Sequence, residues 1–132
     1  MQKDDLGAWG EEVAQDHYKH LGYEILATNA FNPKGLRLGE VDFIARRGDT
    51  LAFVEVKTRS NPETKFGTGL ESVSQAKQLR LRKMVAYYVS SYPEFLKFKP
   101  TIDVVIVQTA ASKFDKNPPN VMIFSNVIED SW

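Results

Sequence analysis

The 132-residue chain contains no cysteine, which excludes disulfide bonds, thiolate metal sites and catalysis by a thiol nucleophile. It also lacks any apolar run close to the roughly 20 residues that a membrane-spanning helix needs. The first residues do not show the basic-then-apolar pattern of a secretory signal peptide. We therefore expect a soluble protein without a membrane partner, and cytoplasmic residence is the default expectation.

The chain also lacks an excess of either charge, because 17 basic residues balance 17 acidic ones. A neutral balance argues against nucleic-acid binding driven by bulk charge. The charges are nevertheless unevenly placed, with acidic residues in the first segment and basic residues between Arg37 and Lys83. A phosphate-contacting face is one interpretation of the basic stretch, and an ordinary solvated surface is the other.

Length and patterning predict a single α/β domain with a core at about residues 5–128. The content of 42% hydrophobic and 26% charged residues is typical of a globular protein rather than a disordered one. Periodicity predicts helices over residues 5–21 and 71–92, and strands over 23–31, 38–46, 50–59, 101–108 and 121–124. This order, αβββαββ, predicts a mixed central sheet whose two faces are covered by the two helices.

The second and third predicted strands carry the residues that point to chemistry. Their short polar connection predicts a hairpin, and side chains alternate between the two faces of each strand. With a two-residue turn, the register places Asp42 opposite Glu55. The same count places Glu40 opposite Lys57. A shift of one residue would abolish this arrangement.

Two carboxylates that face each other across paired strands, at roughly 4.5–5.5 Å between Cβ atoms, repel one another. The hairpin is otherwise apolar, so an acid pair without a partner would raise one pKa or destabilise the fold. A Mg²⁺ or Mn²⁺ ion, which prefers oxygen ligands, would remove this repulsion. Together with Lys57, such a site suits phosphodiester hydrolysis. The alternative is that Glu40 and Lys57 form an ordinary ion pair on the wet side of a hairpin.

Two further polar residues lie on predicted helix faces. Lys77 falls within the apolar stripe of the second helix, where a lysine without an anionic partner is costly. It either reaches the acidic cluster or a substrate phosphate, or extends its amino group past the core edge into water. Glu11 flanks the apolar face of the first helix, beside Gly10, which permits close approach of another backbone. Glu11 is either a third carboxylate of the site or a surface residue.

Other candidates have simpler interpretations. Asp103 is either a hydrogen-bonded structural aspartate or a catalytic acid. His17 is predicted to be a core histidine and His20 an exposed one, and two histidines without a third ligand make a poor zinc site. The aromatic residues at positions 92–98 are interpreted as core packing, with an exposed patch for a protein partner as the alternative.

These residues together resemble a known group of enzymes. Asp42 followed by Glu55-Val56-Lys57 resembles the acid–acid–lysine signature of the PD-(D/E)xK nucleases. More narrowly, the chain resembles the YraN family of small bacterial proteins, relatives of archaeal Holliday-junction resolvases. The resemblance runs from about Gly7 to Val107 and rests on residues 7–14, 21–26, 39–45 and 53–59, with Lys77 and Asp103 also matching.

The resemblance implies a restriction-endonuclease-like fold with an αβββαβ core. It implies that Asp42 and Glu55 bind the metal, with the Val56 carbonyl as a third ligand. It also implies that Lys57 is the catalytic lysine and that Glu11 is the helix-borne acid of the resolvases. The signature proline is absent, which is common in the superfamily. Residue 101 is threonine where the family usually has arginine, so the phosphate contact of that arginine is not expected here.

The leading hypothesis is a metal-dependent endonuclease that hydrolyses phosphodiester bonds of DNA. Branched or single-stranded DNA is the candidate substrate, and a homodimer is a candidate assembly. In this hypothesis the catalytic set is Asp42, Glu55, Lys57, Glu11 and Lys77, with Lys77 orienting the scissile phosphate. The alternative is a nucleic-acid-binding or adaptor module that keeps the nuclease fold but turns over poorly or not at all. Neutral net charge favours this alternative, whereas the retention of mutually repelling acids argues against it.

Overall fold

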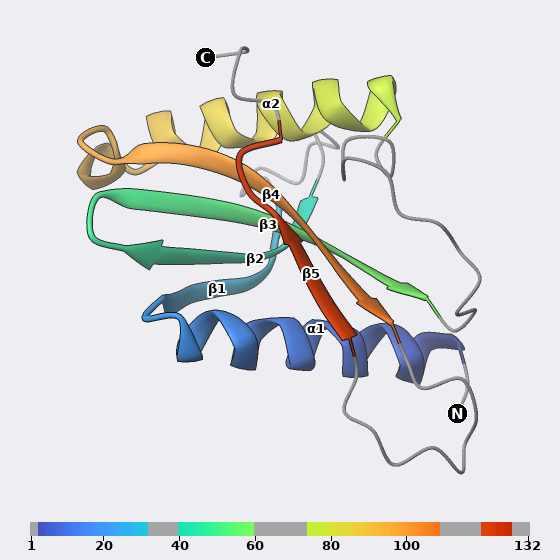
Figure 1. The fold of residues 1–132 in the computed structure, drawn as a ribbon. Helices are drawn as coiled ribbons and strands as arrows, with labels where there is room; N and C mark the ends of the chain where they lie inside the picture. Colours follow the sequence, from blue (N-terminus) through green and yellow to red (C-terminus); the bar gives the residue numbers. More distant parts are fainter. Residues whose placement is uncertain (1–2, 32–39, 60–73, 109–119, 128–132) are drawn as a thin grey trace, which may run out of the picture.

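The computed structural model describes residues 3–31, 40–59, 74–108 and 120–127, and every structural statement below concerns these residues. Their elements, in chain order, are α1 (Lys3–His20), β1 (Glu24–Phe31), β2 (Glu40–Arg47), β3 (Thr50–Arg59), α2 (Gln75–Ser91), the 3₁₀ turn η2 (Pro93–Phe95), β4 (Lys99–Gln108) and β5 (Asn120–Phe124) (Figure 1). The predicted order of helices and strands is confirmed, with η2 as an addition. The start of the second helix is later than predicted, at Gln75, and residues 71–73 lie outside the described part.

The strands form one sheet in the order β1-β2-β3-β4-β5. Three neighbouring pairs are antiparallel, whereas β3 and β4 run parallel from Thr50↔Lys99 to Arg59↔Gln108. The sheet is therefore mixed, as predicted. Parallel neighbours need a crossover connection, and α2 lies within it between β3 and β4. β4 begins two residues earlier than predicted, because the Lys99 N–H donates to the Asp49 carbonyl of the hairpin turn at 2.7 Å.

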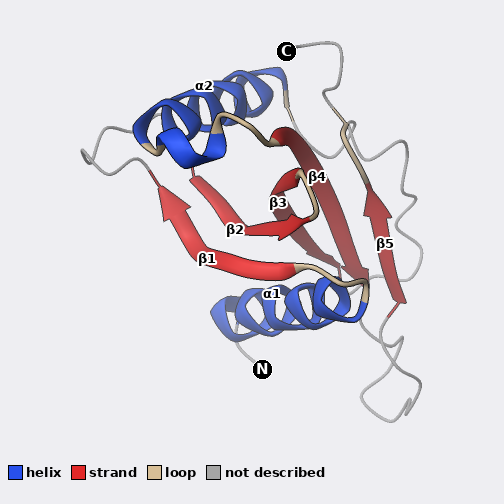
Figure 2. Cartoon of the chain, turned by 90° about the vertical axis from the view of Figure 1, so that its left-hand side faces the viewer, coloured by secondary structure: helices blue, strands red, loops and turns tan. Residues whose placement is uncertain are grey.

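The two helices cover opposite faces of the sheet (Figures 1 and 2). On the α2 face, sheet residues such as Phe53 pack with Leu81 and its helical neighbours. On the α1 face, Ala14 and Tyr18 pack against sheet residues that include Phe43. β4 contributes to both clusters and is buried from residue 102 to residue 107, so the prediction of a central buried strand is confirmed.

The buried face of α1 differs in part from the prediction. Gly10, Ala14 and Tyr18 are buried, whereas His17 is exposed. The prediction of a core histidine at position 17 is therefore wrong. The reason is the phase of the helix: the buried stripe follows a spacing of four residues to Tyr18, whose ring meets that of Phe43 edge-on at 5.2 Å. Neither described helix is long and apolar enough to cross a membrane.

Candidate active site

The hairpin of β2 and β3 has the predicted two-residue turn. Arg47 pairs with Thr50, and the same register continues for four further pairs along the two strands. Gly48 occupies the turn with a φ of 61°, a conformation that glycine adopts without strain. The backbone pairing ends at Phe43↔Val54, one step before Asp42 and Glu55, so the predicted pairing of these two acids stays a prediction.

At this point the Asp42 side chain makes the contact between the strands. Its Oδ2 accepts a hydrogen bond from the Val56 backbone N–H, with 2.6 Å between the two atoms. The N–H and C=O of one strand residue point towards the same neighbouring strand. The Val56 carbonyl therefore points towards the Asp42 side as well. The structure thus brings Asp42 to the residue that follows Glu55.

Glu55 and Lys57 lie two residues apart on β3 and share one face of the sheet. Phe53, the preceding residue on that face, belongs to the core under α2. Glu55 is only 7% exposed, and its Oε1 lies 3.5 Å from the Lys57 Nζ. A buried carboxylate needs a charged or hydrogen-bonding partner, and Lys57 supplies one. β3 becomes half-buried from Val56 onward, so this acid–lysine pair lies where the strand leaves the core.

Helix α1 approaches the same end of β3 on the other face of the sheet. Gly10 is buried, and a Cβ atom at its position would collide with the Thr58 side chain. Thr58 directly follows Lys57, so α1 passes close to the end of β3 that carries the pair. Glu11 is half-buried beside this contact. In the part of the chain that the structure describes, no three acidic or histidine side chains gather to hold a metal ion.

For two of the predicted site residues, Lys77 and Glu40, the structure describes the backbone but not the side chain. Lys77 lies in α2, as predicted, but in its first turn, because the helix begins at Gln75. Leu81, on the same predicted stripe, is fully buried. Glu40 is the first residue of β2 and pairs with Phe31 of β1. The side chains of Lys77 and Glu40 lie outside the described part of the structure. The predicted ion pair between Glu40 and Lys57 therefore stays a prediction.

Asp103 is a second buried acid, and its contacts are structural. It is 1% exposed and accepts hydrogen bonds from the Tyr18 hydroxyl at 2.7 Å and from the Asn126 N–H at 2.9 Å. Burial raises the pKa of the Asp103 carboxyl, while these two hydrogen bonds and one with Thr101 oppose the shift. Burial and the neighbouring Asp103 also raise the pKa of the Tyr18 hydroxyl. By strand alternation Asp103 faces α1, the opposite face from Glu55.

Sequence reasoning did not identify Tyr18 as the partner of this acid. The available signal was its position four residues after Ala14, on the buried face of α1. No local pattern connects it to Asp103, which is 85 residues away along the chain. The pair fixes α1 against β4, and α1 also carries Glu11.

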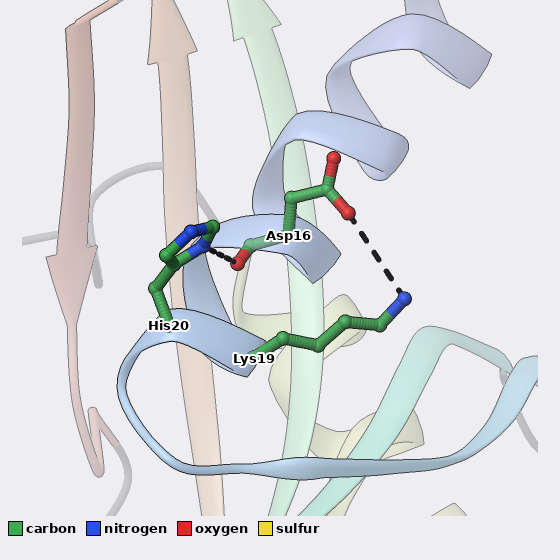
Figure 3. Close-up of polar contacts among 3 residues, drawn as sticks. All are labelled: Asp16, Lys19 and His20. Carbon is green, nitrogen blue, oxygen red and sulfur yellow. Dashed lines mark hydrogen bonds and ion pairs between the residues drawn. The ribbon is translucent and has the colours of Figure 1, made fainter.

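The last turn of α1 shows only local contacts at its surface (Figure 3). The Nδ1 of His20 lies 2.8 Å from the Asp16 backbone oxygen, and the Lys19 Nζ lies 4.0 Å from Asp16 Oδ1. All three residues are exposed, as predicted for His20. Asp16 and Lys19 are therefore suitable reference positions for substitutions of acids and lysines elsewhere.

Aromatic side chains cluster where α2 ends. Tyr88, Tyr92 and Phe95 contact one another with ring centroids 4.8–5.9 Å apart, and Phe98 lies 6.1 Å from Phe95. Phe95 and Phe98 pack against the core, whereas Tyr92 and Leu96 are 36% and 67% exposed. The prediction of core aromatics is therefore right only in part. A pocket of about 380 Å³ beside this cluster is lined by Leu26, Arg46, Tyr88, Glu94, Phe95, Lys97 and Phe98.

Comparison with known proteins shows where the chain belongs. The family model described as "Uncharacterised protein family UPF0102" matches residues 10–107. A UPF0102 protein of Caldicellulosiruptor saccharolyticus is 47% identical over 89 residues, which cover 67% of this chain and 70% of that protein. Its counterpart in Caldicellulosiruptor bescii is 41% identical over 105 residues, covering 80% and 83%. Another in Dictyoglomus thermophilum is 37% identical over 116 residues, covering 87% and 93%. The matched region contains the whole hairpin with its acids and lysine, and the chain therefore belongs to the UPF0102 family.

Proposed function

We propose that this protein is a Mg²⁺- or Mn²⁺-dependent endonuclease that hydrolyses phosphodiester bonds of DNA, within the YraN group of the PD-(D/E)xK superfamily. The observation that carries the proposal is the hydrogen bond from the Val56 N–H to the Asp42 carboxylate. It joins the acid of β2 to the residue that follows Glu55. The Lys57 Nζ lies 3.5 Å from Glu55 Oε1. These two contacts support the proposal that the two acids and the lysine of the sequence pattern form one site.

The donor set of the site suits a hard divalent cation. Asp42 and Glu55 offer carboxylate oxygens, and the Val56 carbonyl points to the same side, so all three groups are the oxygen ligands that Mg²⁺ and Mn²⁺ prefer. Two carboxylates and the Lys57 ammonium leave a formal charge of minus one, which favours uptake of a cation. A bound ion would polarise the scissile phosphate and lower the pKa of water at the site.

Each residue of the site would then have its own role in the hydrolysis. Asp42 and Glu55 fix the position of the site because one is bonded to the backbone and the other is buried. Lys57 places its ammonium group beside Glu55, where it would neutralise charge that develops on the phosphoryl oxygens or hold the attacking water. Glu11 would assist from α1, which meets the same end of β3 at Thr58 on the other face of the sheet. Lys77 would orient the scissile phosphate from α2.

A second candidate function is a nucleic-acid-binding module with little or no turnover. The absence of a three-carboxylate cluster among the described side chains favours it, as do the neutral net charge and the threonine at position 101. Such a module would bind DNA in a salt-dependent manner without cutting it.

A cleavage assay tests the proposal. The purified chain is incubated with fluorescent single-stranded, duplex, flap and four-way-junction DNA in Mg²⁺, Mn²⁺ or EDTA. We expect cation-dependent cleavage that falls by roughly 100-fold or more in Asp42→Asn and Lys57→Ala, the size of effect seen when one stabilising group is removed. Asp16→Asn and Lys19→Ala, which remove an exposed acid and an exposed lysine, should retain full activity. Cleavage that persists in EDTA or in Asp42→Asn would contradict the proposal. Binding without cleavage by the unsubstituted chain would select the second candidate.

A further inference from the structure

The pocket beside the end of α2 has a chemistry that the proposed cleavage site does not use. Three of its lining residues, Tyr88, Phe95 and Phe98, are aromatic and only half-buried, and Leu26 of β1 is 36% exposed at its wall. Its volume of about 380 Å³ is within the range of roughly 300–1,000 Å³ that is usual for small-ligand sites. The pocket therefore offers flat apolar surface to a planar group.

The charged residues of the pocket favour an anionic ligand. Among the lining residues that the structure describes, Arg46 and Lys97 are exposed cations and Glu94 is the single acid, so these residues together carry a net positive charge. The Arg46 Cζ lies 4.8 Å and the Lys97 Nζ 5.8 Å from the centroid of the Phe98 ring. The Arg46 Nε also donates to the Gly48 carbonyl at 3.3 Å, which ties the guanidinium to the hairpin. A planar cation and an aromatic ring thus lie together beside a second cation.

The pocket is connected to the acid–lysine site through the same face of the sheet. On β3, Phe53 lies two residues before Glu55, and its ring meets that of Tyr88 edge-on at 5.9 Å. On β2, Arg46 lies four residues after Asp42, which is about 13 Å along an extended strand. Ile44 lies between these two residues on that face and is fully buried in the core under α2, so the pocket and the acid–lysine site lie at opposite ends of this core.

We propose that this pocket binds an unpaired nucleobase together with its adjoining phosphate, so that the substrate of this protein is DNA with a single-stranded segment. The inference rests on the proposed function, because it takes DNA as the ligand. A splayed base stacks on the aromatic rings and on the Arg46 guanidinium, while Arg46 and Lys97 contact the phosphate. Bases within a duplex stack on one another and do not offer their faces to such a pocket.

Binding measured in EDTA tests the inference without any cleavage. Fluorescence anisotropy compares a labelled oligothymidine with a duplex of the same length, at several salt concentrations. We expect tighter binding of the single strand, and Phe98→Leu, which keeps an apolar side chain but removes the ring, should weaken it by about 5- to 150-fold. Arg46→Gln and Lys97→Gln should each lower the slope of log affinity against log salt by about 0.7. Lys19→Gln, a matched change at an exposed lysine of α1, should alter neither quantity.

Several results would overturn the inference. One is an unchanged single-strand affinity in Phe98→Leu, provided its melting temperature shows that it is folded. Equal slopes of log affinity against log salt in Lys97→Gln and Lys19→Gln would also overturn it. Both lysines are exposed, so neither substitution is expected to disturb the folded core. Displacement of the oligonucleotide by thymidine monophosphate at equal nucleotide concentration would identify a mononucleotide site instead of a strand site. If the unsubstituted chain binds single strands through the pocket but does not cleave them, the proposed function alone is contradicted. If Phe98→Leu cleaves single-stranded DNA at the same rate as the unsubstituted chain, the inference alone is contradicted.

Discussion

The Asp42 carboxylate accepts the Val56 backbone N–H at 2.6 Å, although the two residues lie 14 positions apart in the chain. The contact lies just beyond the last backbone pair of the hairpin, so Asp42 holds β2 and β3 together while it forms part of the candidate site. A substitution at Asp42 therefore affects the stability of the hairpin as well as any bound cation, and the two effects must be measured separately.

Replacement of Asp42 tests its structural role in the absence of metal. Asp42→Ala leaves a partly buried Val56 N–H without this acceptor, which should lower the free energy of unfolding by about 1–3 kcal/mol. Asp42→Asn retains a carbonyl oxygen that can accept the bond and removes the repulsion from Glu55, so its loss should be smaller. Urea unfolding in EDTA measures both values. Equal stability of Asp42→Ala and the unsubstituted chain would show that the bond contributes nothing.

Replacement of Gly10 tests the close approach of α1 to β3. A methyl group at position 10 would collide with Thr58, so Gly10→Ala should lower the free energy of unfolding by about 1–3 kcal/mol. Gly7→Ala is the matched control, because a Cβ atom added there meets no atom of another described element within 4 Å, and alanine favours the helix by up to about 1 kcal/mol. In a Thr58→Ala background the cost of Gly10→Ala should shrink, and this coupling is measurable by a double-mutant cycle. A Gly10→Ala variant as stable as Gly7→Ala would contradict the contact.

The hydrogen bond between Tyr18 and Asp103 predicts a specific loss in Tyr18→Phe. Removal of the hydroxyl deprives a buried carboxylate of a donor, so the free energy of unfolding should fall by about 1–3 kcal/mol. Tyr92→Phe makes the same chemical change on a 36% exposed side chain and should stay within about 0.5 kcal/mol. Chemical unfolding compares the two variants. Equal values for both would argue against a buried bond at position 18.

The raised pKa of Asp103 predicts a pH-dependent stability difference. Burial raises the folded-state pKa of this carboxyl above its unfolded value of about 3.9. Its contribution to stability is then fully present below the unfolded pKa and is lost as the pH rises through the folded pKa. Asp103→Asn has no such titration, so the free energy of unfolding of the unsubstituted chain minus that of the variant should fall as the pH rises from about 4.

Urea unfolding at a series of pH values from 3 to 7, on both proteins, measures this difference and cancels the titration of the other groups. A difference that rises with pH would show that the folded state favours the ionised carboxylate. A constant difference would show that the pKa is the same in both states.

The hairpin was predictable from the sequence because its signals are local. Gly48 and Asp49 mark the turn between two strand patterns, and counting outward from them gives the observed pairs as far as Phe43↔Val54, one step before Asp42 and Glu55. The buried stripe of α1 was harder to assign, because His17 and Tyr18 are adjacent and differ by only 100° around the helix. In the structure Tyr18 is the buried residue of the two, and its hydroxyl donates a hydrogen bond to Asp103, 85 residues further along the chain. No local sequence pattern contains that information.

The central claim is that Asp42 and Glu55 form a divalent-cation site, and thermal unfolding tests it most directly. The melting of the unsubstituted chain, of Asp42→Asn and of the control Asp16→Asn is recorded with and without Mg²⁺ or Mn²⁺. A cation at about 100 times its dissociation constant, bound only to the folded state, should add about 2.7 kcal/mol to the free energy of unfolding. We predict this gain in the unsubstituted chain and in Asp16→Asn, and its loss in Asp42→Asn. An equal gain in all three proteins, or none in the unsubstituted chain at saturating cation, would contradict the account.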